Sequence, residues 1–105
     1  MGVSVEGGDG MKIGSLVEIS TFCQNSHHNL KIAFTGLTLW FSYEECIAFK
    51  WLNKMVICEN RWNKTTGKHL NAIDRDKKLR VNFDNFRHQL TDLTTHLQIY
   101  LSELP

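Results

Sequence analysis

The stretch from Leu37 to Asn71 decides the fold of this chain. Residues 37–51 read LTLWFSYEECIAFKW, and residues 55–71 read MVICENRWNKTTGKHLN. Up to Trp62, aromatic and β-branched residues are frequent in both pieces, which is typical of strands in a packed sheet. The short connections between the pieces favour an antiparallel meander. We predict three strands here, at Leu37–Tyr43, Cys46–Trp51 and Met55–Trp62.

The segments before this stretch extend the sheet towards the N-terminus. Apolar residues alternate with their neighbours over Ser15–Phe22 and Leu30–Phe34, which predicts two further strands. Residues 1–10 contain four glycines. We expect them to form a flexible tail, because glycine loses more conformational freedom on folding than any other residue. A single domain is then expected over residues 11–105.

The segment after Trp62 is polar and rich in turn-forming residues. Asn63–Gly67 predicts a turn, because Asn and Thr side chains bond the local backbone and glycine tolerates positive φ. His69–Ile73 fits either a helical turn or a return to the sheet, and the pattern does not choose between them. We expect two short elements to follow, a charged turn and an edge strand, at Asp74–Lys78 and Leu79–Val81.

The C-terminal segment predicts one long amphipathic helix. Asn82 is a suitable N-cap, and Asp84 places negative charge in the first turn. Apolar residues then recur at alternating spacings of three and four, at Phe83, Phe86, Leu90, Leu93, Leu97, Tyr100 and Leu104. This stripe predicts a helix that covers the sheet. Because coiled coils use the same spacing, the alternative is that the helix forms the seam of a homodimer.

These elements predict an α+β fold. We expect an antiparallel sheet of about five strands, with one long C-terminal amphipathic helix packed on one face. The three tryptophans do not all fit one core face of such a sheet. We therefore expect Trp40 and Trp51 to be buried and Trp62 to be partly exposed, where it could contact a partner.

Charge is distributed unevenly along the chain. The net charge is only +1, but residues 61–80 carry seven Lys and Arg against two Asp, while both flanking segments have an excess of acidic residues. This excludes a globally basic nucleic-acid binder and leaves one local cationic segment. Arg61–Arg80 is therefore a candidate contact for an anion, a nucleic acid or an acidic protein surface.

Cysteine and histidine usage indicates a reducing compartment and no cofactor. Three cysteines without paired spacing argue against a disulfide framework, and no apolar run is long enough to cross a membrane. Cys23, His27 and His28 supply too few ligands for a zinc site without a further cysteine, so we expect no metal. A catalytic pair of His69 with a cysteine or carboxylate is possible, but we expect a protein that is not an enzyme.

The candidate binding site gathers hydroxyls, cations and an indole around Gly67. This is not a phosphate-binding P-loop, because the earlier glycine of that motif is missing. One interpretation is purely structural: a solvent-exposed hairpin end whose Asn and Thr side chains form hydrogen bonds with the local backbone. The functional interpretation is an outward-facing docking surface formed by Arg61, Trp62, Lys64, Thr65, Thr66, Lys68, His69, Lys77 and Lys78.

Two motifs carry a resemblance to a known family. Trp-Phe-Ser-Tyr-Glu at residues 40–44 and Thr-Thr-Gly-Lys-His-Leu-Asn at residues 65–71 resemble a family of small uncharacterised proteins encoded by phages and prophages. The resemblance covers residues 11–86 and departs at Glu45-Cys46, where the family has Thr-Pro. It implies an accessory viral protein of the host cytoplasm, and it carries over no catalytic residue.

The resemblance and the cationic segment together give two functional hypotheses. The first is a non-enzymatic phage protein that binds and inhibits a host protein, such as a component of a defence system. The alternative is a nucleic-acid-binding protein that uses residues 61–80. A possible homodimer through the C-terminal helix is compatible with both hypotheses.

Overall fold

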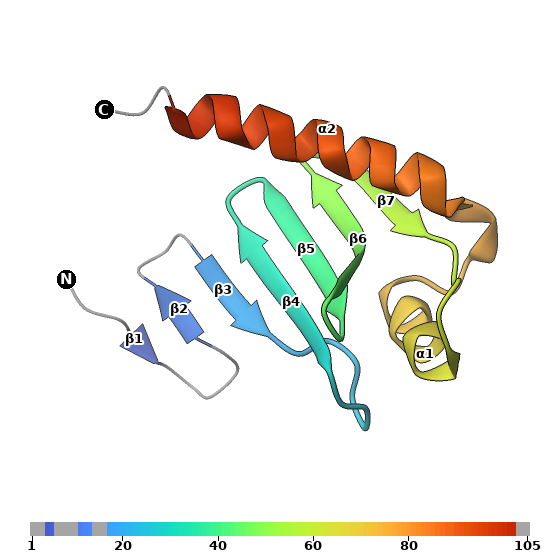
Figure 1. Cartoon of the computed structure of the whole chain (residues 1–105). Coiled ribbons are helices and arrows are strands. Elements are labelled where there is room, and N and C mark those ends of the chain that lie inside the picture. Colours follow the sequence, from blue (N-terminus) through green and yellow to red (C-terminus); the bar gives the residue numbers. More distant parts are fainter. Residues whose placement is uncertain (1–3, 6–10, 14–16, 103–105) are drawn as a thin grey trace.

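The computed structural model describes residues 4–5, 11–13 and 17–102 of the chain. Eight strands form one sheet in sequence order, and two helices, α1 (Lys64–Ile73) and α2 (Phe83–Ser102), pack against it (Figure 1). The strands are β1 (Ser4–Val5), β2 (Met11–Ile13), β3 (Val17–Ser20), β4 (Asn29–Phe34), β5 (Leu37–Ser42), β6 (Glu45–Trp51), β7 (Lys54–Cys58) and β8 (Arg80–Val81).

The predicted α+β class is confirmed, but the sheet is mixed. Each strand from β1 to β6 is antiparallel to the next, whereas β8 runs parallel to β7. The prediction of a purely antiparallel sheet of about five strands is therefore wrong. The reason is the connection after β7: the chain passes through α1 and a short 3-10 helix, η1 (Lys77–Leu79), and this crossover returns β8 in the same direction. Of the predicted tail, only Ser4–Val5 lies within the described residues.

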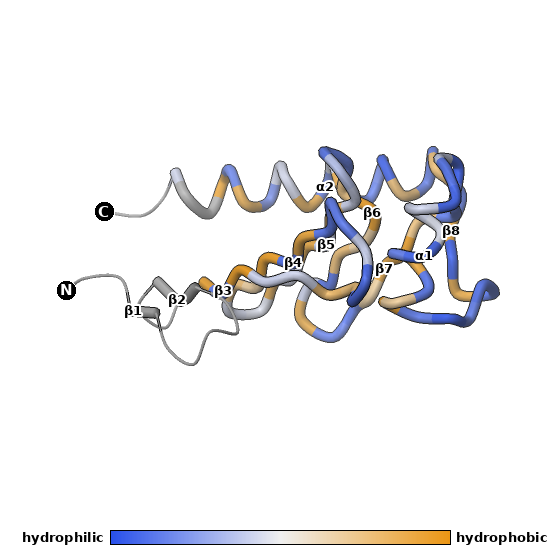
Figure 2. Tube along the Cα trace, turned by 90° about the horizontal axis from the view of Figure 1, so that it is seen from below, coloured by the Kyte–Doolittle hydropathy of each residue, from blue (hydrophilic) through white to orange (hydrophobic). Residues whose placement is uncertain are grey.

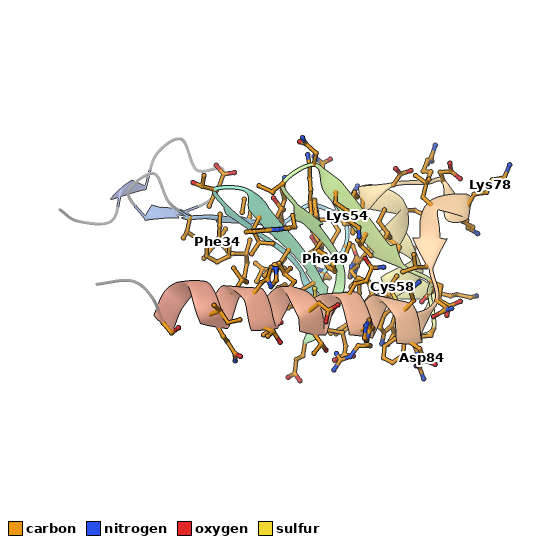
Figure 3. The ribbon with its side chains drawn as sticks, turned by 90° about the horizontal axis from the view of Figure 1, so that it is seen from above. Phe34, Phe49, Lys54, Cys58, Lys78 and Asp84 are labelled. Atoms are coloured by element: carbon orange, nitrogen blue, oxygen red, sulfur yellow. The ribbon has the colours of Figure 1, made fainter. Side chains whose placement is uncertain are left out.

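The long C-terminal helix is confirmed. Asn82 caps it, because its Oδ1 accepts a hydrogen bond from the Asn85 N–H at 2.8 Å. Figure 2 shows α2 as a separate layer along one face of the sheet. Phe86 is fully buried there and packs against Phe49, with 5.7 Å between the ring centroids. Figure 3 shows Phe49 and Cys58 on the side of the sheet that faces this helix.

A second helix lies where the sequence predicted a turn. Asn63 does satisfy local backbone as predicted, but as an N-cap, accepting a hydrogen bond from the Thr66 N–H at 2.8 Å, whereas the Thr66 hydroxyl bonds Ser42 instead. The helix α1 then continues to Ile73. The preceding strand ends at Cys58 rather than Trp62, because Asn60 Oδ1 accepts from the Trp62 N–H at 3.0 Å and turns the chain away from the sheet.

A bulge in β6 supplies the surface that α1 covers. The register between β5 and β6 shifts between Trp40 and Phe41, so Ile47 has no partner on β5 and both Ile47 and Ala48 are fully buried in one cluster. That cluster also contains Ile57 and Leu70 of α1 and is separate from the cluster under α2. The two helices therefore cover opposite faces of the sheet.

The tryptophans differ from the prediction. All three are partly buried, so Trp40 and Trp51 are less enclosed than expected. Trp62 packs edge-on against Phe83, with 6.1 Å between the ring centroids, and contacts both core clusters.

Among the residues that the structure describes, no helix is both long enough and apolar enough to cross a membrane.

The packing of α2 gives a direct stability prediction. Phe86→Ala removes a fully buried ring from the contact between α2 and the sheet and should lower the free energy of unfolding by about 3–5 kcal/mol. Ile99→Ala on the same helix is the control: that side chain is 54% exposed, and its truncation should cost less than about 0.5 kcal/mol. Urea denaturation measures both variants, and equal losses would contradict the described packing.

Candidate functional site

The two sequence motifs meet in one buried polar cluster. Ser42 Oγ, at the end of β5, lies 2.7 Å from His69 Nδ1 and 2.8 Å from Thr66 Oγ1, both on α1. The three side chains are at most 2% exposed. Ser42 belongs to the Trp-Phe-Ser-Tyr-Glu motif, and Thr66 and His69 belong to the Thr-Thr-Gly-Lys-His-Leu-Asn motif. The motifs thus join the sheet to α1.

The second nitrogen of His69 connects this cluster to the loop before β4. Ser26 Oγ lies 2.8 Å from His69 Nε2, so both ring nitrogens are engaged by hydroxyl groups. A neutral imidazole satisfies this arrangement with one donor and one acceptor nitrogen, because hydroxyls can do either. Burial lowers the pKa of His69; nearby His28 acts in the same direction, while a backbone hydrogen bond with His27 opposes it.

Asn29 holds the same loop in shape. Its Oδ1 accepts from the N–H groups of Phe22 and Cys23 at 2.8 and 2.9 Å, and its Nδ2 donates to the carbonyls of Cys23 and Ser26 at 3.2 and 3.1 Å. These bonds end β3 earlier than the predicted Phe22. They also place Ser26 against His69, so Asn29 positions the hydroxyl group that bonds His69 Nε2.

Backbone strain is concentrated near the cluster. Asn25, His28 and Tyr43 have φ values of 60°, 60° and 58°, in the left-handed region that disfavours residues other than glycine. His28 and Tyr43 stack with ring centroids 4.8 Å apart, and the Tyr43 N–H donates to the His28 carbonyl at 2.7 Å. Such strain persists only where surrounding contacts over-determine the conformation.

The chemistry of the buried cluster favours a structural role. A serine–histidine pair resembles a nucleophile with its base, but the third group is a neutral hydroxyl, which stabilises an imidazolium poorly. His69 is also fully buried. The pairing of His69 with Cys46 or Cys58 is not formed, because both cysteines pack in the cluster under α2, on the opposite face from α1. Burial raises their pKa values, to about 12 for Cys46 and about 11 for Cys58.

The predicted binding residues separate into an inner and an outer set. Thr66 and His69 belong to the buried cluster, which corrects their assignment to an outward-facing surface: the helical turn of α1 directs them at Ser42. Thr65 and Trp62 are partly buried. The remaining predicted residues are exposed, namely Arg61, Lys64, Lys68, Lys77 and Lys78.

We define the cationic surface as the exposed side chains of Lys64 and Lys68 on α1 and of Lys77 and Lys78 on η1. Lys64 and Lys68 are one helical turn apart and lie on the same side of α1. Lys78 points away from the body of the molecule (Figure 3). Arg61 differs from them, because its guanidinium lies over the Phe83 ring at 3.9 Å from the centroid.

None of these lysines is neutralised by a described acidic side chain. His88 and Asp92, 3.7 Å apart on α2, form the one pair of potential opposite charges within 4.0 Å in the part of the chain that the structure describes. The same residues contain no group of three or more His, Cys, Asp or Glu side chains placed to hold a metal ion. The cationic surface is therefore available to an external anion.

Sequence reasoning missed the partners of His69. Ser42 could have been suspected, because it is a hydroxyl residue in an otherwise apolar run next to aromatic residues. No sequence pattern indicated that Ser26 contacts His69, because Ser26 lies in a polar loop and is 43 positions away along the chain.

The geometry defines a small α+β domain in which a short helix is fastened to one end of a sheet by buried polar groups. A family of unknown function, DUF8033, matches residues 11–86, and the chain belongs to this family. The match contains the three residues of the buried cluster, together with Ser26, and ends in the first turn of α2. No curated protein and no solved structure matches the chain.

The burial of His69 predicts a pH dependence of stability. Because the folded state lowers the pKa of His69 below its ordinary value of 6.5, the unfolded chain binds a proton first as the pH falls. The free energy of unfolding should therefore decrease below pH 6.5, by up to about 1.4 kcal/mol per pH unit, until the folded pKa is reached.

The measurement compares urea denaturation of the wild type and His69→Asn as the pH is lowered. The variant lacks only this histidine, so the difference in slope reports its contribution. If the variant does not fold, NMR of the wild-type imidazole provides the readout: His69 should remain neutral at a pH where free histidine is protonated. Protonation of His69 at its ordinary pKa would contradict the prediction.

Proposed function

We propose that this chain is a non-enzymatic phage accessory protein that binds and inhibits a host protein, with the cationic surface as its docking site. The observation that carries the proposal is the set of four exposed lysines on α1 and η1, none of them paired with a described acid. Charges that are not satisfied internally are free to attract and orient an acidic partner. The phage setting rests on the motif resemblance.

Rigidity of the surface supports this proposal. Binding is less costly when the groups that contact the partner are already ordered. The buried cluster joins α1 to β5 through Ser42 and to the loop before β4 through Ser26. Lys64 and Lys68 are therefore presented by a helix that is held from beneath at two points, rather than by a free turn.

The proposed setting is the host cytoplasm. The three cysteines are free thiols in the structure, which fits a reducing compartment. The chemistry of His69 and of the buried cysteines, described above, supports binding rather than catalysis.

Nucleic-acid binding is the second candidate. The local excess of Lys and Arg over residues 61–80 favours contact with phosphates. Trp62 weighs against a single-stranded target, because its indole is partly buried and packs against both core clusters, whereas base stacking needs an exposed aromatic face. A duplex backbone, bound through charge alone, is the form of this candidate that the geometry supports.

A charge-reversal experiment tests the docking surface. Lys64→Glu/Lys68→Glu should weaken capture of host proteins from a lysate by at least about ten-fold, because two like charges on the contact become repulsive. Lys50→Glu/Lys54→Glu is the matched control: it reverses two exposed lysines on β6 and β7 and should bind as the wild type does.

Labelled DNA and RNA of about 20 nucleotides provide the second arm, at several salt concentrations. A steep salt dependence, lost in the α1 variant only, would favour the nucleic-acid candidate. Equal effects of both charge reversals on host-protein capture would contradict a localised docking surface.

A further inference from the structure

We infer that a hollow between α1 and β8 receives one carboxylate side chain of the acidic partner, an inference that rests on the proposed function. The hollow has a volume of about 390 Å³ and lies beside the cationic surface. Its walls come from the two residues that follow β7, from α1, from η1 and from β8. They are formed by Glu59, Asn60, Gly67, Asn71, Lys77 and Arg80.

Arg80 supplies the first reason for an anionic ligand. Its Nη2 donates to Asn71 Oδ1 at 2.8 Å and to the Asp74 carbonyl at 3.2 Å, which fixes the guanidinium against α1. Its Nε is buried and makes no hydrogen bond to any described residue. A buried donor without a partner costs about 1–3 kcal/mol, so it needs an explanation. Arg80 also lines the hollow, and guanidinium groups bind carboxylates through paired donors, so the fixed guanidinium favours a carboxylate there.

Gly67 supplies the second reason. Glycine within a helix costs about 0.5–1 kcal/mol relative to alanine, and Gly67 lies near the middle of α1. A Cβ at this position would lie 3.0 Å from Asn60 Nδ2, across the hollow wall. Asn60 has little freedom to move, because its Nδ2 donates to the Asn63 carbonyl and its Oδ1 accepts from Trp62. The missing side chain therefore keeps both Asn60 and the hollow in place.

The charges around the hollow favour a monoanion. Lys77 and Arg80 contribute two positive charges and Glu59 one negative charge, so one further negative charge balances the walls. One oxygen of Glu59 is already occupied, because Oε2 accepts from the Phe83 N–H at the start of α2 at 2.9 Å. A phosphate with two charges would exceed this balance and would be repelled more strongly by Glu59. We therefore assign the hollow to the carboxylate of an Asp or Glu side chain.

The test is an NMR titration of the full-length, nitrogen-15-labelled protein with a glutamate-rich peptide at low salt. The expected result is a shift of the Arg80 Nε–H signal, identified by its absence in Arg80→Lys, together with the Gly67 N–H signal. Gly67→Ala should weaken peptide binding about five- to ten-fold, because its methyl group would press against Asn60 and shift this wall of the hollow. Lys77→Gln, an exposed and unpaired residue, should weaken it too and keeps the test valid if Gly67→Ala does not fold.

Each other outcome overturns a defined part of the inference. If the peptide shifts Lys64 and Lys68 signals but leaves Arg80 and Gly67 unchanged, the hollow is not used, although the proposed docking surface remains. If inorganic phosphate or duplex DNA shifts Arg80 while the peptide does not, the assignment to a carboxylate is wrong. If none of these probes shifts any signal of α1 or η1, both the inference and the proposed function fail.

Discussion

The hydrogen bond between Ser42 and His69 is the interaction on which the rest of the structure depends. It connects the last residue of β5 to a side chain of α1 across 27 positions, and both groups are buried. Because both groups are buried, moving α1 away from Ser42 would leave the Ser42 hydroxyl, His69 Nδ1 and the Thr66 hydroxyl without the partners that they share. The bond therefore sets where α1 lies relative to the sheet, and this position determines what α1 presents to solvent.

The side of α1 that faces the sheet and the side that faces solvent have different roles. Towards the sheet, Thr66, His69 and Leu70 complete the polar cluster and one apolar core. Towards solvent, the same helix carries lysines and, at Gly67, one wall of the hollow. Because a helix is rigid over this length, the buried contacts and the surface groups are placed together. The geometry of the docking surface is thus a consequence of interior hydrogen bonds.

The spacing of apolar residues and the helix-capping residues made much of the fold predictable from the sequence. The leucine spacing and the Asn82 cap predicted α2 correctly, and alternation predicted the strands from β4 to β6 closely. For α1, the helical alternative for His69–Ile73 is the one that the structure shows, but the start of the helix at Lys64 was missed because an Asn followed by Thr and Gly is equally suited to a turn and to a helix start. The strand β8 was predicted as an edge strand at Leu79–Val81, but its parallel direction was missed because that direction depends on the crossover that contains α1. Likewise, the inward direction of His69 depends on Ser42 and Ser26, which local sequence does not specify.

Native-state hydrogen exchange in Ser42→Ala is the most direct measurement of whether buried polar contacts fasten α1 to the sheet. The substitution removes one hydroxyl and leaves His69 Nδ1 and Thr66 Oγ1 without their shared partner. The amides of α1 should then exchange about ten-fold faster or more, relative to those of β6 and β7, because the helix opens without unfolding the sheet. Unchanged protection of α1, or an equal loss throughout the sheet, would contradict this role of the cluster.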